Sequence, residues 1–182
     1  GYFSPADGSQ YWITTPLSRQ LVHRWRSEED AVLVGYRTAL ADDPQLTVRE
    51  WTGRNPLRIV IDRDLTLPPE LKLFDQSEKT VVFNALKTGV EGNIQYLEVE
   101  NFNYYLPQFL LYQLYLMDVQ SVIIEGGAAT LEAFIRNGLW DEARIFTGAA
   151  DLPGGIPAPL VYGTLAGEAR IGKDLLLIYR NP

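Results

Sequence analysis

The sequence predicts an α/β fold in which helices flank a mixed, mainly parallel sheet and antiparallel strands close the C-terminal end. Short apolar runs alternate with helical stretches along most of the 182 residues, which is typical of α/β proteins. Residues 168–180 instead form two consecutive predicted strands that turn near residues 172–174, and such strands pair antiparallel. No repeat or long linker interrupts the chain, so its length predicts a single domain over residues 1–182.

The first third of the chain contains a helix, a buried strand and a short helix. The first helix is expected to begin at Thr15-Pro16, because proline is favoured at the first helical position, and to end near residues 27–29. Its apolar residues recur at helical spacing; they are Leu17, Leu21, Val22 and Trp25. The other two elements are a strand closed by Gly35 and a short helix stopped by proline, at residues 31–34 and 37–41.

The rest of the chain continues this alternation. Strands are predicted where β-branched and aromatic residues cluster, at residues 57–62, 80–83, 94–99, 121–125 and 143–147. Helices are predicted at residues 104–117 and 130–136, and Asn137-Gly138 ends the second of them. Residues 152–157, rich in proline and glycine, are expected to form a loop.

Composition narrows the classes of function. The chain has no Cys and a single His, which excludes thiolate chemistry and a zinc site built from Cys and His, so no metal site is expected. A net charge of −7 argues against a nucleic-acid binder. No apolar run reaches the ~20 residues of a membrane span. The lack of Cys and of a signal peptide at the first residues indicates the cytoplasm.

The positive charges of the first third come from Arg alone. Residues 1–63 contain eight Arg, no Lys and eight acidic residues, so the whole net charge of −7 comes from residues 64–182. Arg is the better residue for bidentate recognition of phosphate and carboxylate groups. Salt bridges on helix surfaces would produce the same composition, and composition alone favours them.

The strongest local signal lies at residues 122–130, where a buried strand passes through two glycines into a helix. Such a junction exposes backbone N–H groups and the positive end of a helix, which together attract an anion. Gly126 and Gly127 allow the close approach of a phosphate, and Glu125 lies at the carboxyl end of the strand, where α/β sheets bind ligands. The alternative is a plain turn with a surface Glu, since neither the dinucleotide fingerprint nor a P-loop is present.

A second group of polar residues combines Thr38, the adjacent Asp42 and Asp43, and Arg49. Adjacent carboxylates ordinarily mark a solvated helix end or a cap, but these four residues lie close enough in sequence to hold a polar ligand together. His23 is a candidate general base. Its place inside a predicted helix, with no motif around it, favours a structural role.

Together these segments resemble the reductase domain of the bifunctional deaminase/reductase of riboflavin biosynthesis. The matching segments follow the family's order along nearly the whole chain; they are Trp12-Ile13-Thr14, Ser18, residues 22–27, residues 30–35, Thr38, residues 42–44, Leu46-Thr47, Arg49, and residues 56–62, 125–127 and 138–142. The resemblance implies a dihydrofolate-reductase-like fold. It also implies the reduction of 5-amino-6-(5-phosphoribosylamino)uracil to the ribitylamino compound, with NADPH as the source of hydride.

The resemblance further implies which residues form the site. The cofactor residues would be Trp12, Thr38, Asp42, Arg63, Gly127, Ala128, Ala129, Thr130 and Leu131, and the substrate residues Arg26, Leu46, Arg49 and Glu125. Arg26 and Arg49 suit a 5′-phosphate, which accepts bidentate hydrogen bonds. A competing interpretation pairs Arg26 with Glu29 along the helix surface. Glu125 is expected to orient the substrate or to assist proton transfer during ring opening.

The sequence departs from the family at three places. Gln10 and Arg63 stand where the family often has Ser, and the chain starts at the Gly of an expected Asp-Gly turn, so that the first strand with its Lys and an upstream deaminase domain are expected to be missing. The alternatives are dihydrofolate reductase itself, a stand-alone reductase of a related pyrimidine, and a non-catalytic nucleotide-binding or assembly module. A homodimer is expected from the family and from the apolar residues 175–179, which would offer a long apolar edge or face.

Overall fold

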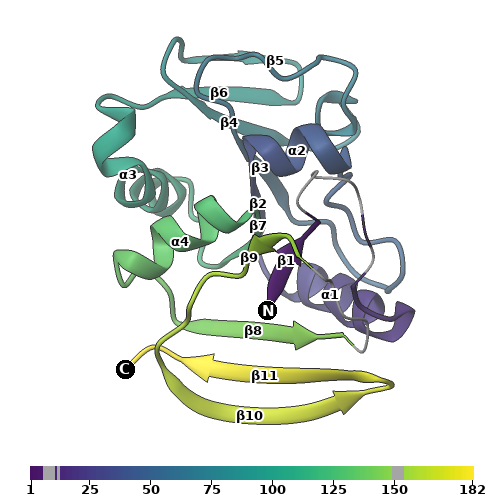
Figure 1. The fold of residues 1–182 in the computed structure, drawn as a ribbon. Coiled ribbons are helices and arrows are strands. Elements are labelled where there is room, and N and C mark those ends of the chain that lie inside the picture. Colours follow the sequence, from purple (N-terminus) through teal and green to yellow (C-terminus); the bar gives the residue numbers. More distant parts are fainter. Residues whose placement is uncertain (6–10, 12, 149–153) are drawn as a thin grey trace.

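The computed structural model describes residues 1–5, 11, 13–148 and 154–182. Its centre is a six-stranded sheet in the order β5-β6-β4-β3-β2-β7, with helices on both faces (Figure 1). The strands are β2 (Ala31–Gly35), β3 (Leu57–Ile61), β4 (Thr80–Asn84), β5 (Gly89–Glu91), β6 (Ile94–Glu98) and β7 (Val122–Gly126). All neighbours are parallel except β5, which pairs antiparallel with β6 at the edge. The predicted α/β class with a mainly parallel sheet is confirmed.

Four helices enclose this sheet. They are α1 (Pro16–Glu28), α2 (Tyr36–Asp42), α3 (Phe102–Leu116) and α4 (Ala128–Arg136), with a short 3-10 helix η1 (Lys72–Phe74). Figure 1 shows α3 and α4 on one side of the sheet and α1 and α2 on the other. Within the described ranges, no helix is long and apolar enough to cross a membrane.

The alternation of side chains along the strands produces two separate cores. In β2, Ala31 and Leu33 pack in the cluster beneath α3 and α4, whereas Val32 and Val34 pack in the cluster that contains Ala39 of α2. All four are at most 1% exposed, and each large apolar side chain contributes about 1.5–3 kcal/mol when fully buried. The strand therefore needs apolar residues at every position, which explains the continuous run that predicted it.

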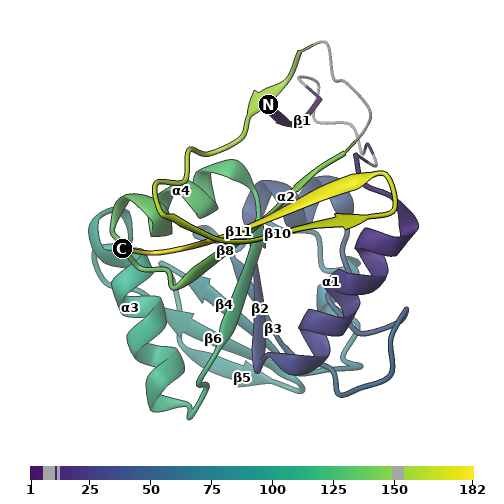
Figure 2. The same cartoon turned by 90° about the horizontal axis from the view of Figure 1, so that it is seen from below.

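A second, three-stranded antiparallel sheet lies below the first in Figure 1 and in front of it in the view from below (Figure 2). It consists of β8 (Glu142–Thr147), β10 (Thr164–Ile171) and β11 (Asp174–Arg180) in the order β10-β11-β8. The antiparallel C-terminal strands are thus confirmed. Of the edge or face expected from residues 175–179, the free edge is wrong, because β11 is the central strand of this sheet and β10 forms the outer edge; the apolar face stays a prediction.

Three very short strands, β1, β5 and β9, were not predicted. β1 (Tyr2–Ser4) pairs antiparallel with β9 (Ile156–Pro157). The loop expected over residues 152–157 is therefore wrong at Ile156 and Pro157, and its first two residues lie outside the described part. A strand of two residues shows no periodicity, and its pairing partner lies more than 150 positions away.

The start of α1 is fastened to the second sheet by Asp174. Its Oδ2 accepts hydrogen bonds from the backbone N–H of Thr15 at 2.7 Å, from Thr15 Oγ1 at 2.8 Å and from Ser18 Oγ at 2.6 Å. Burial raises the pKa of the Asp174 carboxyl, but the hydrogen bonds from Ser18 and Thr15 outweigh burial and lower the pKa below its usual range. Further along α1, the ring of Trp25 stacks on Phe146 of β8 at 5.5 Å. These contacts fix the rotation of α1.

Candidate functional site

The candidate site lies at the carboxyl ends of β2 and β7, where the strand order reverses. From β2 the chain continues to β3 on one side, whereas β7 returns on the other side of β2. The following helices, α2 and α4, leave the two strands on opposite faces of the sheet (Figure 1). Ligands of open α/β sheets bind in the crevice that such a switch point creates.

Glycines at both strand ends bring two threonines into this crevice. A Cβ added at Gly35 would lie 2.2 Å from Thr130 Oγ1, and one added at Gly127 would lie 2.9 Å from Thr38 Oγ1. The Gly126–Gly127 peptide bond is cis. The structure therefore places Thr38, Gly127 and Thr130 together, although Thr38 comes from α2 and Thr130 from α4.

The N-terminus of α4 opens directly from this turn. Its first intrahelical hydrogen bond is the one from the Leu131 N–H to the Gly127 carbonyl, at 3.1 Å. The N–H groups of Ala128, Ala129 and Thr130 precede that bond, and such groups have no partner inside a helix. They provide the donors and the positive helix end that a phosphate needs.

Glu125, the residue before the glycines, forms a bidentate ion pair with Arg26 of α1. Arg26 Nε donates to Glu125 Oε1 and Arg26 Nη2 to Glu125 Oε2, both at 2.6 Å. The side chains are only 10% and 17% exposed. Two residues that the resemblance assigns to the substrate are thus joined, although 99 positions separate them. The interpretation that pairs Arg26 with Glu29 is wrong, since Glu29 lies 3.6 Å from Arg144.

Thr47 connects this ion pair to Arg49. Its carbonyl accepts a hydrogen bond from Arg26 Nη1, and its Oγ1 accepts one from Arg49 Nη1, each at 3.2 Å. Sequence reasoning missed this residue, although it lies between Leu46 and Arg49 in a segment that matched the family. The Thr47 hydroxyl contacts Arg49 and the Thr47 carbonyl contacts Arg26, so the residue as a whole links two guanidinium groups of the same site.

His23 supports the same group from α1. The backbone N–H of Arg49 donates to His23 Nδ1 at 3.2 Å. Burial first, and then the charges of Arg26 and Arg49, lower the pKa of His23 below its ordinary 6.5, whereas Glu50 and Glu125 raise it to a smaller extent. The imidazole is therefore neutral near pH 7, as an acceptor at Nδ1 requires.

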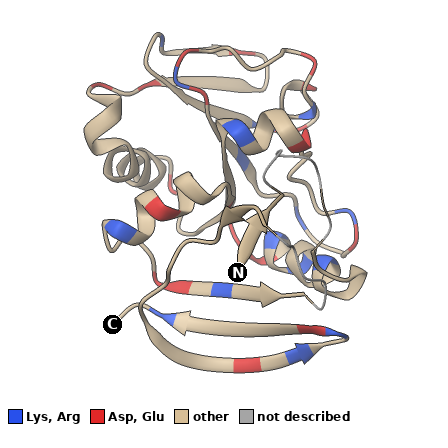
Figure 3. Ribbon diagram, viewed as in Figure 1, with Lys and Arg blue, Asp and Glu red and all other residues tan. Residues whose placement is uncertain are grey.

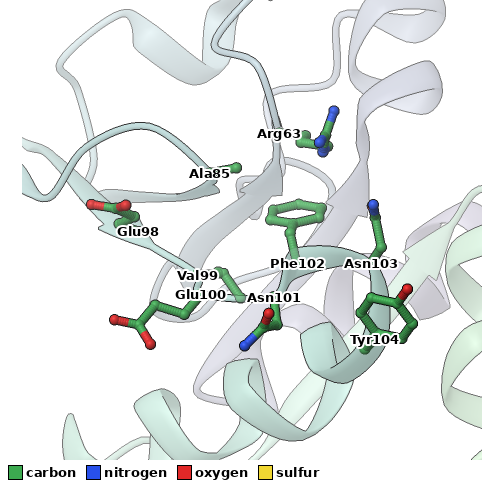
Figure 4. Close-up of a pocket in the computed structure, with 9 residues that line it drawn as sticks. All are labelled: Arg63, Ala85, Glu98, Val99, Glu100, Asn101, Phe102, Asn103 and Tyr104. Carbon is green, nitrogen blue, oxygen red and sulfur yellow. The ribbon is translucent and has the colours of Figure 1, made fainter.

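A separate hollow of about 530 Å³ lies farther along the same edge of the sheet, at the ends of β3, β4 and β6. Its lining residues are Arg63, Ala85, Glu98, Val99, Glu100, Asn101, Phe102, Asn103 and Tyr104. Figure 4 shows the ring of Phe102 in the middle, with Arg63 on one side and the carboxylates of Glu98 and Glu100 on the other. The resemblance named only Arg63 among these residues. The others lie at the ends of β4 and β6, outside the segments that matched the family.

The remaining expected residues are more dispersed. Leu46 is 1% exposed in the core, with a φ of 57°, so only its main-chain groups are available to a ligand. Asp42 lies exposed at the end of α2, yet nearby protein atoms remove enough solvent to raise the pKa of its carboxyl. Asp43 pairs with Lys72 at 3.0 Å and has a structural role. Trp12 and Gln10 lie outside the described residues.

Charges are distributed unevenly around the crevice at β2 and β7 and the hollow beside Arg63. Every residue of α3 is uncharged and is drawn tan in Figure 3. The charged groups that face His23 come instead from α1, from β7 and from residues 49–50. Of the eight arginines of the first third, Arg26 and Arg49 lie near Glu125, whereas others pair elsewhere, such as Arg58 with Asp75.

Comparison with known proteins identifies the family. Residues 1–162 match the model of the RibD C-terminal domain. The chain is 33% identical to the riboflavin biosynthesis protein RibD of Aquifex aeolicus over 153 residues, which cover 80% of this chain and 42% of that protein. It is 31% identical over 184 residues to the chloroplastic riboflavin biosynthesis protein PYRR of Arabidopsis thaliana, covering 98% of this chain and 30% of that protein.

A solved structure agrees with these relatives. The diaminohydroxyphosphoribosylaminopyrimidine deaminase/5-amino-6-(5-phosphoribosylamino)uracil reductase of Thermotoga maritima superimposes with a TM-score of 0.87 at 26% identity, over 100% of this chain and 53% of that chain. The chain spans less than half the length of the two curated relatives, 42% and 30%. Because the family model covers residues 1–162 of the 182 and the fold agrees, the chain belongs to the RibD C-terminal domain family.

Proposed function

We propose that this chain transfers hydride from NADPH to C1′ of 5-amino-6-(5-phosphoribosylamino)uracil, a reduction in riboflavin biosynthesis. The observation that carries the proposal is the buried Arg26–Glu125 pair, which stands directly before the Gly126-Gly127 turn at the switch point. It unites a polar substrate site with a phosphate-binding helix end. The relative from Thermotoga maritima carries this reductase activity in its name.

The residues of the crevice fit a dinucleotide. The N–H groups that precede the first hydrogen bond within α4 suit its pyrophosphate, and Thr38 and Thr130 add hydroxyl donors beside the glycines. The hollow beside Arg63 suits the adenosine end, because three strand spacings, or about 14 Å, separate β7 from β4. Arg63 is half exposed, with 51% of its side chain in solvent, and supplies a cation for a 2′-phosphate.

The chemistry divides into ring opening and reduction. Ring opening breaks the C1′–O4′ bond, leaves a C1′=N double bond and moves the proton of the nitrogen to O4′. NADPH supplies a hydride to C1′ when it is bound, and the nitrogen takes a proton from solvent. The balance is substrate plus NADPH plus one proton to the ribitylamino product plus NADP⁺. The protein contributes position and electrostatics.

Each side chain has a distinct part in this proposal. Both oxygens of Glu125 accept hydrogen bonds from Arg26, so Glu125 orients the substrate as an acceptor at the reacting end. Arg26 is already engaged with Glu125 and Thr47, and it mainly holds that carboxylate in place. Arg49 therefore has the freer guanidinium, and we assign the 5′-phosphate to it first.

Calorimetric titration of the folded protein tests the cofactor assignment. NADPH is expected to bind more tightly than NADH. Arg63→Ser is expected to reduce that preference about ten- to a hundred-fold, because a hydrogen bond to a charged group is worth roughly 1.5–3 kcal/mol. Arg37→Ser is a matched control on the exposed surface of α2. An unchanged preference in Arg63→Ser would remove Arg63 from the site, and no heat with NADPH would overturn the cofactor.

A further inference from the structure

We infer that His23 is a positioning residue, which holds Arg49 in place through its neutral Nδ1 and makes substrate binding depend on its protonation state. The inference rests on the proposed function, because it takes the substrate phosphate to be bound by Arg49. The observation behind it is the hydrogen bond from the Arg49 backbone N–H to His23 Nδ1, at 3.2 Å. His23 is 6% exposed and comes from a different element, 26 positions away.

The segment that carries Arg49 lies along one side of α1. Besides the bond to His23, the guanidinium of Arg24 lies 5.8 Å from the centre of the Trp51 ring. Gly53 approaches so closely that a Cβ there would lie 2.4 Å from Ser27 Cβ. Of these three contacts, only the one through His23 is a hydrogen bond to the backbone of Arg49 itself.

Arg49 borders open space on this side. Together with Gln20, Glu50, Trp51 and Thr52, it lines a hollow of about 590 Å³. A side chain at the rim of such a hollow has many rotamers, and ordering it costs entropy. Fixing the Arg49 backbone reduces the number of conformations of the free protein, so less entropy is lost when the guanidinium binds the phosphate. The His23 contact therefore favours substrate affinity without touching substrate.

Protonation removes this contact. Nδ1 then carries a hydrogen, so that two donors face each other and the Arg49 N–H loses its acceptor. The new charge would also stand among Arg26, Arg49, Glu50 and Glu125, which are the charged groups that face His23 from α1, the 49–50 segment and β7. Burial and the two cations disfavour that charge more than the two carboxylates favour it, so protonation adds an unfavourable charge and removes the hydrogen bond.

The direction with pH follows from the lowered pKa. Because the folded protein disfavours the protonated imidazole, the Arg49 contact is complete above pH 6.5 and is lost as the pH falls through the lower folded value. Folding stability changes with the same sign, since the unfolded chain binds the proton more readily. Substrate affinity is expected to weaken on acidification in step with this titration.

NMR spectroscopy of the imidazole nitrogens tests the contact directly. The chain has one His, so a tag-free sample gives a single set of imidazole signals. The expected result is a proton on Nε2 and a bare Nδ1 at neutral pH, with the Arg49 amide signal shifting on acidification at the same midpoint as the imidazole. A neutral ring with its proton on Nδ1, or an Arg49 amide indifferent to the titration, would overturn the inference.

Two substitutions separate this role from simple packing. Calorimetric titration with the phosphorylated pyrimidine is expected to show about tenfold weaker binding by His23→Leu, which leaves the Arg49 N–H without an acceptor. His23→Asn, whose Oδ1 replaces Nδ1 as an acceptor, should stay within about threefold of the parent and lose the imidazole titration. The substrate phosphate titrates near pH 6 in all three proteins, so only the difference between them reports on His23.

The outcomes distinguish this inference from the function on which it rests. If the parent protein fails to bind the pyrimidine while Arg49→Ala behaves identically, the proposed substrate site is wrong. If the parent binds and Arg49→Ala does not, but His23→Leu binds as tightly as the parent at neutral pH, only the role of His23 is wrong. Failure of His23→Asn to recover affinity lost in His23→Leu would also contradict the acceptor role.

Discussion

Arg26→Ala is expected to lower the free energy of unfolding by about 3–5 kcal/mol, as is found when one partner of a buried ion pair is removed. The reason is the Glu125 carboxylate, whose side chain is only 17% exposed and which would lose both of its 2.6 Å hydrogen bonds. The Thr47 carbonyl would lose a donor as well. Equilibrium unfolding in urea measures the change. Turnover should disappear too, because Glu125 would no longer be held beside the glycine turn.

The same helix offers a matched control. Arg24 pairs with Glu28 one turn away, and their side chains are 51% and 48% exposed. Arg24→Ala should therefore cost no more than about 1 kcal/mol. The double variant Arg26→Met with Glu125→Leu should regain most of the lost stability, since apolar residues of similar size can replace a buried pair, but no turnover. Equal stability loss in Arg24→Ala and Arg26→Ala would contradict this account of the site.

Arg58→Met is expected to lower the free energy of unfolding by about 3 kcal/mol, although Arg58 lies outside the candidate site. Arg58 is 0% exposed in β3 and donates to Thr80 Oγ1 at 3.0 Å, Asp75 Oδ1 at 3.1 Å, and the carbonyls of Lys72 at 3.0 Å and Glu78 at 2.8 Å. Met retains much of the volume but none of the donors. Buried acceptors left without partners each cost about 1–3 kcal/mol, and partial rehydration of Asp75 reduces the total.

Arg54→Met serves as the comparison for this second variant. Arg54 pairs with Asp30 near the start of the same strand, but 59% of its side chain is exposed, so its loss should cost about 1 kcal/mol or less. Both variants should bind NADPH as tightly as the parent protein does under conditions in which they remain folded. A loss of stability in Arg58→Met no larger than in Arg54→Met would show that its buried hydrogen bonds contribute little net stability.

Most elements of the fold could be predicted because their signals are local. The start of α1 is predicted by Pro16, and β2, a strand buried on both faces, is predicted by its continuous apolar run. The structure confirms both. The junction from Ile124 through the glycines into α4 was also found, since strand, turn and helix start are contiguous. The strand β1 was not, because three residues paired with a two-residue partner carry no periodic signal.

The site was only partly predictable for the same physical reason. Sequence and resemblance named Arg26 and Glu125 separately, but their pairing depends on the rotation of α1, which Asp174 and Phe146 fix from the second sheet. A lone His inside a helix favoured a structural role, and its contact with Arg49 appears only when the loop folds back. The full burial of Arg58 could not be predicted, because a charged residue is expected at the surface and its hydrogen-bond acceptors come from residues 72–80.

The most direct test of the central claim is turnover by the purified chain with NADPH and 5-amino-6-(5-phosphoribosylamino)uracil. Loss of NADPH absorbance and formation of the ribitylamino product by mass spectrometry would be followed in the same sample. We expect one NADPH consumed for each product formed, slower reaction with NADH, and no reaction with Glu125→Gln. A folded protein that consumes no NADPH with this pyrimidine, or that reduces a dihydropteridine instead, would contradict the proposed function.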